Sequence, residues 1–162
     1  MSIFMQIDGI QGDVSDQNHK NWIDVLELDW RDARKITSSL STQGDRESSN
    51  AIISDLKFLK FMDIATTQLF AEACCGQGKQ AVIHLTKTGK GRGDEVYMAY
   101  TLKNCFVSDY AVSITPDHRD RPMEIITLGF TYAEVRYTSY DDKGIPITSA
   151  SRSFDAATNM LG

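Results

Sequence analysis

Hydrophobic and polar residues alternate along most of the chain, in short segments rich in Ile, Val, Thr, Tyr and Phe. Such side chains suit a pleated, half-buried surface, and a period of two is typical of β-strands. The pattern therefore predicts a mainly β protein. We expect strands at Ser2–Ile7, Trp22–Trp30, Ala51–Leu59, Gln80–Thr86, Val96–Ile114, Met123–Tyr137 and Ile147–Phe154.

The clearest strand is Met123–Tyr137, in which Ile126, Leu128, Phe130 and Tyr132 would share one face. We expect it to pair with the last strand, because Asp141–Gly144 carries turn chemistry between them and its glycine can take positive φ. In the long segment Val96–Ile114 the alternation breaks near Lys103-Asn104. A bend there lets a sheet close on itself, which favours a β-barrel.

One segment has a helical period. Between Thr66 and Cys75 the apolar residues Leu69, Phe70, Ala73 and Cys74 fall at helical spacing. Thr66 is an acceptable N-cap, and Gly76 stands where a glycine ends a helix. We predict one short α-helix that packs against the barrel through Leu69, Phe70 and Ala73.

The segment Arg31–Asn50 is polar and contains few apolar residues, which predicts a long extended loop. No repeat or linker divides the chain, so we expect one domain over residues 1–162. A chain of this length can bury a core without disulfide or metal support.

The composition narrows the class of protein. The 17 basic and 22 acidic residues give a net charge of −5, which argues against a nucleic-acid partner. No run of about 18 apolar residues predicts membrane insertion, and the first residues lack the features of a cleaved signal peptide. Three cysteines, two of them adjacent at Cys74 and Cys75, form no disulfide framework. We expect buried thiols in a protein that folds in the cytoplasm.

Three patterns could carry chemistry, and none is convincing. Ser54-x-x-Lys57 with Lys87-Thr88-Gly89 matches two motifs of penicillin-recognising serine hydrolases. That chemistry places the serine at the start of a helix, whereas Ser54 lies in a predicted strand. The glycine-rich segment Gly89–Gly93 resembles a phosphate-binding loop, but a strand rather than a helix follows it.

The third pattern is a possible metal site, because the chain has three histidines at positions 19, 84 and 118. No two of them stand at the spacing of a metal pair, and no C-x-x-C motif exists. We therefore expect no catalytic residue, no cofactor and no bound metal.

Several segments in colinear order resemble one family, the haemolysin-coregulated proteins (Hcp) that form the tube of the bacterial type VI secretion system. Ile7-Asp8-Gly9-Ile10-Gln11-Gly12, followed by Asp16 and His19, is similar to the family's opening, and Ile23–Leu26 followed by Trp30 is similar to its next strand. Further similar positions are Asp55, Leu56, Phe58, Lys60, Asp63, Leu69, Ala73, Gly76, Glu124, Leu128, Phe130, Val135, Tyr137, Gly144 and Phe154.

The resemblance implies a β-barrel of two antiparallel sheets with one short α-helix at its side. It also implies hexameric rings that stack into a hollow tube, with sheath and spike proteins of the machine as partners and effectors in the lumen. The tube would be built in the cytoplasm and then secreted without a cleaved signal peptide. The alternative that remains open is a barrel that binds a small ligand in its interior.

The same resemblance suggests site residues. Aligned with the family's tryptophan-ended strand, Asp29 falls where side chains face the tube interior, and Glu27 shares that face. The long loop offers both signs of charge, which suits a contact between rings or neighbouring subunits. The candidates for this contact are Arg31, Asp32, Arg34, Lys35, Asp45, Arg46 and Glu47.

Overall fold

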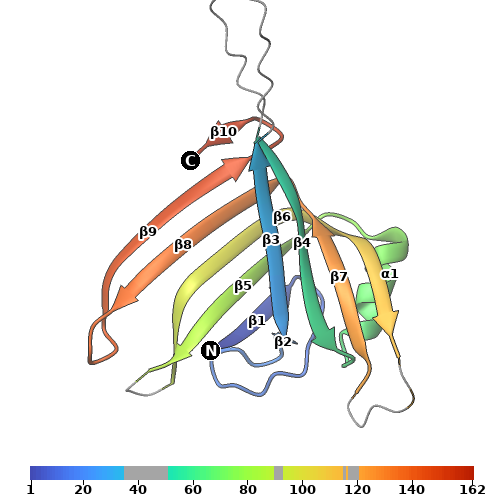
Figure 1. Ribbon diagram of the computed structural model, residues 1–162, viewed down its shortest axis with the longest axis horizontal. Helices are drawn as coiled ribbons and strands as arrows, with labels where there is room; N and C mark the ends of the chain where they lie inside the picture. The colour runs from blue at the N-terminus through green and yellow to red at the C-terminus, as the bar shows by residue number, and fades with distance from the viewer. Residues whose placement is uncertain (35–50, 90–92, 115, 117–120) are drawn as a thin grey trace, which may run out of the picture.

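A computed structural model describes residues 1–34, 51–89, 93–114, 116 and 121–162 of the chain (Figure 1). Within these ranges it contains ten strands and one helix. They are β1 (Ser2–Ile7), β2 (Ile23–Val25), β3 (Glu27–Arg34), β4 (Ala51–Phe61), α1 (Thr66–Cys75), β5 (Lys79–Thr88), β6 (Asp94–Ser113), β7 (Met123–Gly129), β8 (Tyr132–Tyr140), β9 (Pro146–Asp155) and β10 (Met160–Leu161).

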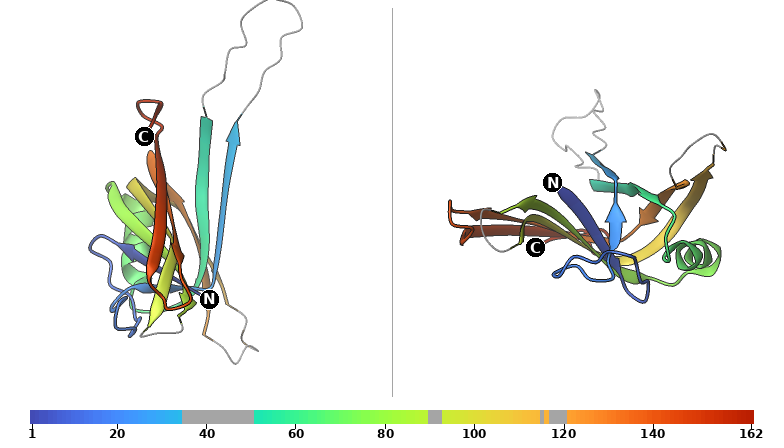
Figure 2. Two further views of the ribbon diagram at one scale, coloured as in Figure 1. Left: turned by 90° about the vertical axis from the view of Figure 1, so that its left-hand side faces the viewer. Right: turned by 90° about the horizontal axis from the view of Figure 1, so that it is seen from below.

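The strands form two antiparallel sheets that share β6. The first sheet has the order β10-β9-β8-β6-β5-β1-β2. In the second, β3 pairs with β4, β4 with β7, and β7 with the second half of β6. Buried side chains from both sheets fill the space between them, among them Met5, Ile83, Phe58 and Ile126. This arrangement confirms the barrel-like fold of two antiparallel sheets (Figures 1 and 2).

The shared strand bends where the sequence predicts it. Residues Met98–Lys103 of β6 pair with β8, whereas Phe106–Ser113 pair with β7. Between these halves Asn104 takes a φ of 53°, a conformation that asparagine tolerates better than most residues. The bend turns one strand from the first sheet into the second, and so it curls the sheet around the core.

Two predicted strands are each divided in the structure, and both divisions have the same cause. The predicted strand Trp22–Trp30 is interrupted at Leu26, because β2 pairs with β1 in one sheet and β3 with β4 in the other. The predicted strand Met123–Tyr137 is interrupted after Gly129, where the chain leaves β4 and the second half of β6 and pairs, as β8, with the first half of β6 and with β9. At Leu26 the apolar alternation changes phase, a signal that the prediction of one strand passed over. After Gly129 the alternation runs on to Tyr132, but Ala133 rather than Tyr132 is buried, so the predicted common face ends at that crossing. The predicted pairing with the last strand is confirmed, and Gly144 in the connecting turn has a φ of 78°.

The predicted loop Arg31–Asn50 begins later than expected. Residues 31–34 belong to β3, and its end pairs with Ala51–Ile53 at the start of β4. A strand of charged residues is stable there because main-chain hydrogen bonds to β4 hold it. The rest of the predicted loop, residues 35–50, lies outside the described residues.

Helix α1 has the predicted bounds but a narrower buried face. Leu69 is fully buried, whereas Phe70, Ala73, Cys74 and Cys75 are exposed. The expectation of a buried Phe70, Ala73 and cysteine pair is therefore wrong, because the helix rests on the barrel along a single turn. The N-cap is Ala65 rather than Thr66, and it makes no side-chain capping bond. Instead, the Thr66 hydroxyl accepts a hydrogen bond from the Asp63 N–H at 3.0 Å.

Candidate functional site

The outer face of the second sheet is the surface on which the candidate residues lie. Along β4, Leu56, Phe58 and Lys60 are buried in the barrel, so the alternate residues point outward. The same alternation on β7 buries Ile126 and Leu128 and exposes Ile125. No described helix or strand covers this outer face (Figure 2).

Glu27 and Asp29 are both exposed on β3 at this face. They stand opposite Leu59 and Lys57 of β4, respectively. Together with Ile125 of the next strand, these four residues line a shallow hollow of about 220 Å³. Neither carboxylate has an ion-pair partner within the described residues. The face therefore presents two negative charges beside an apolar strip, which is formed by Leu59 and Ile125.

The charged candidates of the predicted loop are only partly described. Arg31 is exposed on β3. Asp32 and Arg34 belong to the same strand, of which the structure describes the backbone at these two positions but not the side chains. Lys35, Asp45, Arg46 and Glu47 lie entirely outside the described residues.

Beneath this face lies a buried ionic network that sequence reasoning missed. Lys60 and Glu124 are both 0% exposed, and Lys60 Nζ lies 2.7 Å from Glu124 Oε2. The same ammonium lies 2.8 Å from Asp63 Oδ1 and donates to the Phe61 carbonyl at 2.8 Å. Tyr110 donates its hydroxyl to Glu124 Oε1 at 2.7 Å, and burial with this bond raises the pKa of Tyr110 to about 12. The network ties β4, β6 and β7 to the segment that leads into α1.

A second polar cluster joins residues that are far apart in sequence. His19 is buried, and its Nδ1 donates to Asp16 Oδ1 at 2.9 Å, since a carboxylate can only accept. Its Nε2 lies 3.0 Å from Nδ1 of His84 on β5. Phe4 stacks on the His19 ring and Trp22 packs against both histidines.

The environment of this pair shifts two pKa values. Burial, followed by the neighbouring His19 and Arg136, lowers the pKa of His84 to about 4. The hydrogen bond from His19 lowers the pKa of Asp16. The spacing of 65 residues between the histidines gave no signal in the sequence, because only the pairing of β1 with β5 brings them together.

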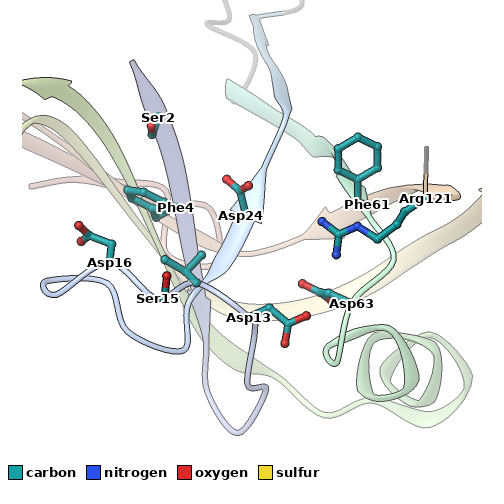
Figure 3. A pocket seen from close by; sticks show the side chains of 10 residues that line it. Ser2, Phe4, Asp13, Ser15, Asp16, Asp24, Phe61, Asp63 and Arg121 are labelled. Carbon is teal, nitrogen blue, oxygen red and sulfur yellow. The ribbon is translucent and has the colours of Figure 1, made fainter. Parts of the chain in front are cut away.

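A hollow of about 390 Å³ opens next to this cluster (Figure 3). Its carboxylates come from separate elements: Asp13 and Asp16 from the loop after β1, Asp24 from β2 and Asp63 from the segment before α1. They are spread around the hollow instead of converging on one point. Asp63 is already held by Lys60, and Asp16 by His19.

The described residues form no recognisable catalytic or metal centre. Ser54 and Lys57 lie along strand β4, so the helical geometry that the hydrolase motif needs is absent from this segment. No group of three His, Cys, Asp or Glu side chains among the described residues could hold a metal ion. In the same part of the chain no helix has the length and apolarity to cross a membrane.

Comparisons with known proteins place this fold. The family model of the type VI secretion system effector Hcp matches residues 4–137. The protein Hcp1 of Pseudomonas aeruginosa is 29% identical over 140 residues, which cover 85% of this chain and 83% of the relative.

Two solved structures agree with these matches. Hcp1 of Salmonella typhimurium superposes with a TM-score of 0.78 at 25% identity, over 99% of this chain and 98% of the other. A type VI secretion system effector of Yersinia pestis superposes with a TM-score of 0.73 at 25% identity, over 94% and 98%. Because the family model spans most of the chain, and its residues build the second sheet, α1 and most of the first sheet, the chain belongs to the Hcp family of type VI secretion proteins.

Proposed function

We propose that this chain is the subunit of a type VI secretion tube, built from hexameric rings that stack around an open lumen. The family match over residues 4–137 carries the proposal. The fold supports it, because each chain has its own filled core and needs no strand from a neighbour to complete it.

In this proposal the outer face of the second sheet lines the lumen. It is a large sheet face that no described element covers, and Glu27 and Asp29 give it free negative charge. Effector proteins carried in the lumen would meet these carboxylates and the apolar strip beside them.

The charged residues at the end of β3 and beyond serve contacts between rings or adjacent subunits. They are Arg31, Asp32, Arg34, Lys35, Asp45, Arg46 and Glu47. Both signs of charge occur, and complementary charges set the register of a contact more than its affinity. Sheath and spike proteins of the machine would be the outer partners, and the tube would be assembled in the cytoplasm before secretion.

The test is the oligomeric state. Purified protein at high micromolar concentration should elute from a size-exclusion column as a ring-sized species. Negative-stain electron microscopy should show rings with an open centre. A strictly monomeric protein would overturn the proposal. It would favour the alternative of a ligand-binding barrel, although the side chains packed between the two sheets leave that alternative without structural support.

A further inference from the structure

Among the described strands, β3, β9 and the second half of β6 each present a free edge over several residues. Strand β9 pairs with β8 along its length but meets β10 only at Phe154 and Asp155, so its other edge is open from Pro146 to Arg152. The second half of β6, Phe106–Ser113, has β7 as its one strand neighbour among the described residues, with a bulge between Val107 and Asp109, and Phe70 of α1 packs against its Tyr110. Main-chain N–H and C=O groups on such edges are available to another strand.

The β9 edge lacks the features that usually protect an edge strand. Residues 146–151 carry no charge, and most of them are small: Thr148, Ser149, Ala150 and Ser151. In contrast, β3 is an edge strand with five charged residues in eight and a bulge between Trp30 and Asp32. Charges and bulges discourage pairing with another chain, and a long uncharged edge invites it.

The free edges of β9 and of the second half of β6 lie on opposite sides of the molecule. The β8–β9 hairpin forms one side, and α1 with the end of β6 forms the other, in the front view and in the view from below (Figures 1 and 2). In Figure 1, β9 runs upward and the end of β6 runs downward. A rotation about the vertical axis of that view would therefore bring the β9 edge of one copy antiparallel to the β6 edge of the next.

Each edge carries a single charge, and the two charges are opposite. Arg152 is the one charged residue of Pro146–Phe154, and Asp109 is the one charged residue of Phe106–Ser113. Both side chains are exposed. The Arg152 guanidinium donates only to the carbonyl of the adjacent Ser151, at 3.2 Å, and neither side chain has an ion-pair partner among the described residues.

We propose that β9 of one copy adds to β6 of the next as an antiparallel strand, with Arg152 opposite Asp109. This register places Thr148 opposite Ser113, so that the paired stretch of β6 begins after its bulge at Val107–Asp109. The small residues Ser149, Ala150 and Ser151 of β9 then stand opposite Val112, Ala111 and Tyr110. The contact joins two different surfaces, as a closed ring requires. The inference rests on the proposed ring and deepens it, because it names the surfaces through which a second copy of this chain binds.

A charge exchange tests the pairing. Arg152→Asp and Asp109→Arg should each raise the concentration at which half of the protein is assembled by at least about tenfold, because each places like charges together. The double variant Arg152→Asp/Asp109→Arg should restore assembly. Lys143→Asp in the β8–β9 turn is the matched control and should assemble like the wild type. Size exclusion with light scattering measures assembly, and circular dichroism checks that each variant is folded.

Cross-linking gives a second measurement that does not depend on destabilising the contact. Arg152→Cys and Asp109→Cys are combined in a chain whose exposed Cys74 and Cys75 are replaced by serine. Oxidised glutathione should link the two new thiols between copies, giving a ladder of covalent oligomers. Either single cysteine variant should give none.

The outcomes separate this inference from the proposed function. Wild-type rings with unaffected single variants, or a double variant that does not recover, would overturn the β9–β6 pairing and leave the ring standing. A missing covalent ladder in assembled wild-type-like rings would do the same. A wild-type protein that stays monomeric would overturn both.

Discussion

Lys60 and Glu124 are register partners across β4 and β7, with both side chains fully buried and 2.7 Å between Nζ and Oε2. Taking two charges out of water is costly, so such a pair is stable only when its remaining hydrogen-bonding capacity is used. Asp63, the Phe61 carbonyl and Tyr110 fulfil this need. The pair thereby specifies the alignment of β4 with β7, because a slip of one residue would turn one charge outward and leave the other unpaired.

Removing the cation should be strongly destabilising. Lys60→Met leaves two buried carboxylates, those of Glu124 and Asp63, without their common partner. We expect a loss of about 3–5 kcal/mol in the free energy of unfolding, measured by urea denaturation. Lys143→Met, in an exposed turn, is the control and should change stability by less than about 0.5 kcal/mol. A Lys60→Met protein as stable as this control would contradict the buried network.

The helix gives a matched pair of adjacent substitutions. Leu69→Asp places a charge at a fully buried position and should destabilise the protein by several kcal/mol. Phe70→Asp changes a side chain that is 56% exposed and should cost about 1 kcal/mol or less. Thermal unfolding of the two variants checks the assignment. Equal losses would show that α1 does not present Leu69 alone to the barrel.

The histidine pair predicts a pH dependence of stability. The pKa of His84 is about 4 in the folded protein, below the usual histidine value of 6.5. Between these two values the unfolded chain binds a proton that the folded chain does not, so stability rises with pH through this window and falls as the solution is acidified. Because His84 is only half-buried, we expect about 1 kcal/mol, less than the full shift would give.

Denaturation curves at pH 4.5 and pH 7 measure this effect. His84→Gln keeps a polar side chain without a titrating ring, and it should reduce the stability difference between the two pH values. An unchanged difference in that variant would assign the pH dependence to other groups.

The sequence predicts strands and helix well where their cause is local. Alternation locates every long strand, and the helical period locates Thr66–Cys75 with its bounds. The breaks at Leu26 and after Gly129 arise from the choice of partner strand; a phase shift in the alternation marks the first break, and nothing in the alternation marks the second. For the same reason the sequence does not predict the contacts Lys60–Glu124 and His19–His84. Their partners are more than 60 residues apart, and the pairing of distant strands brings them together.

The candidate site was predicted in a different way. Glu27 and Asp29 were named from the family resemblance, and the structure shows them exposed on one sheet face beside Lys57 and Ile125. Nothing in their local sequence distinguishes them from charges on any solvated strand. The sequence of β9 does not predict its free edge either, because a strand has a free edge only when the fold places no second strand beside it.

Inverting the charge at Asp29 tests the proposed lumen. Asp29→Arg replaces an exposed carboxylate that has no described ion-pair partner, so the fold and the ring should be unaffected. If the face lines the lumen, a cargo protein that meets it through basic side chains should co-purify at least about tenfold less, since like charges at a contact oppose binding and about 1.4 kcal/mol already changes an affinity tenfold. Asp142→Arg, in the exposed β8–β9 turn, is the matched control. Pull-down of each effector with both variants, together with its secreted amount, measures the change. Equal cargo binding and export for Asp29→Arg and the control would show that this sheet face does not contact the cargo.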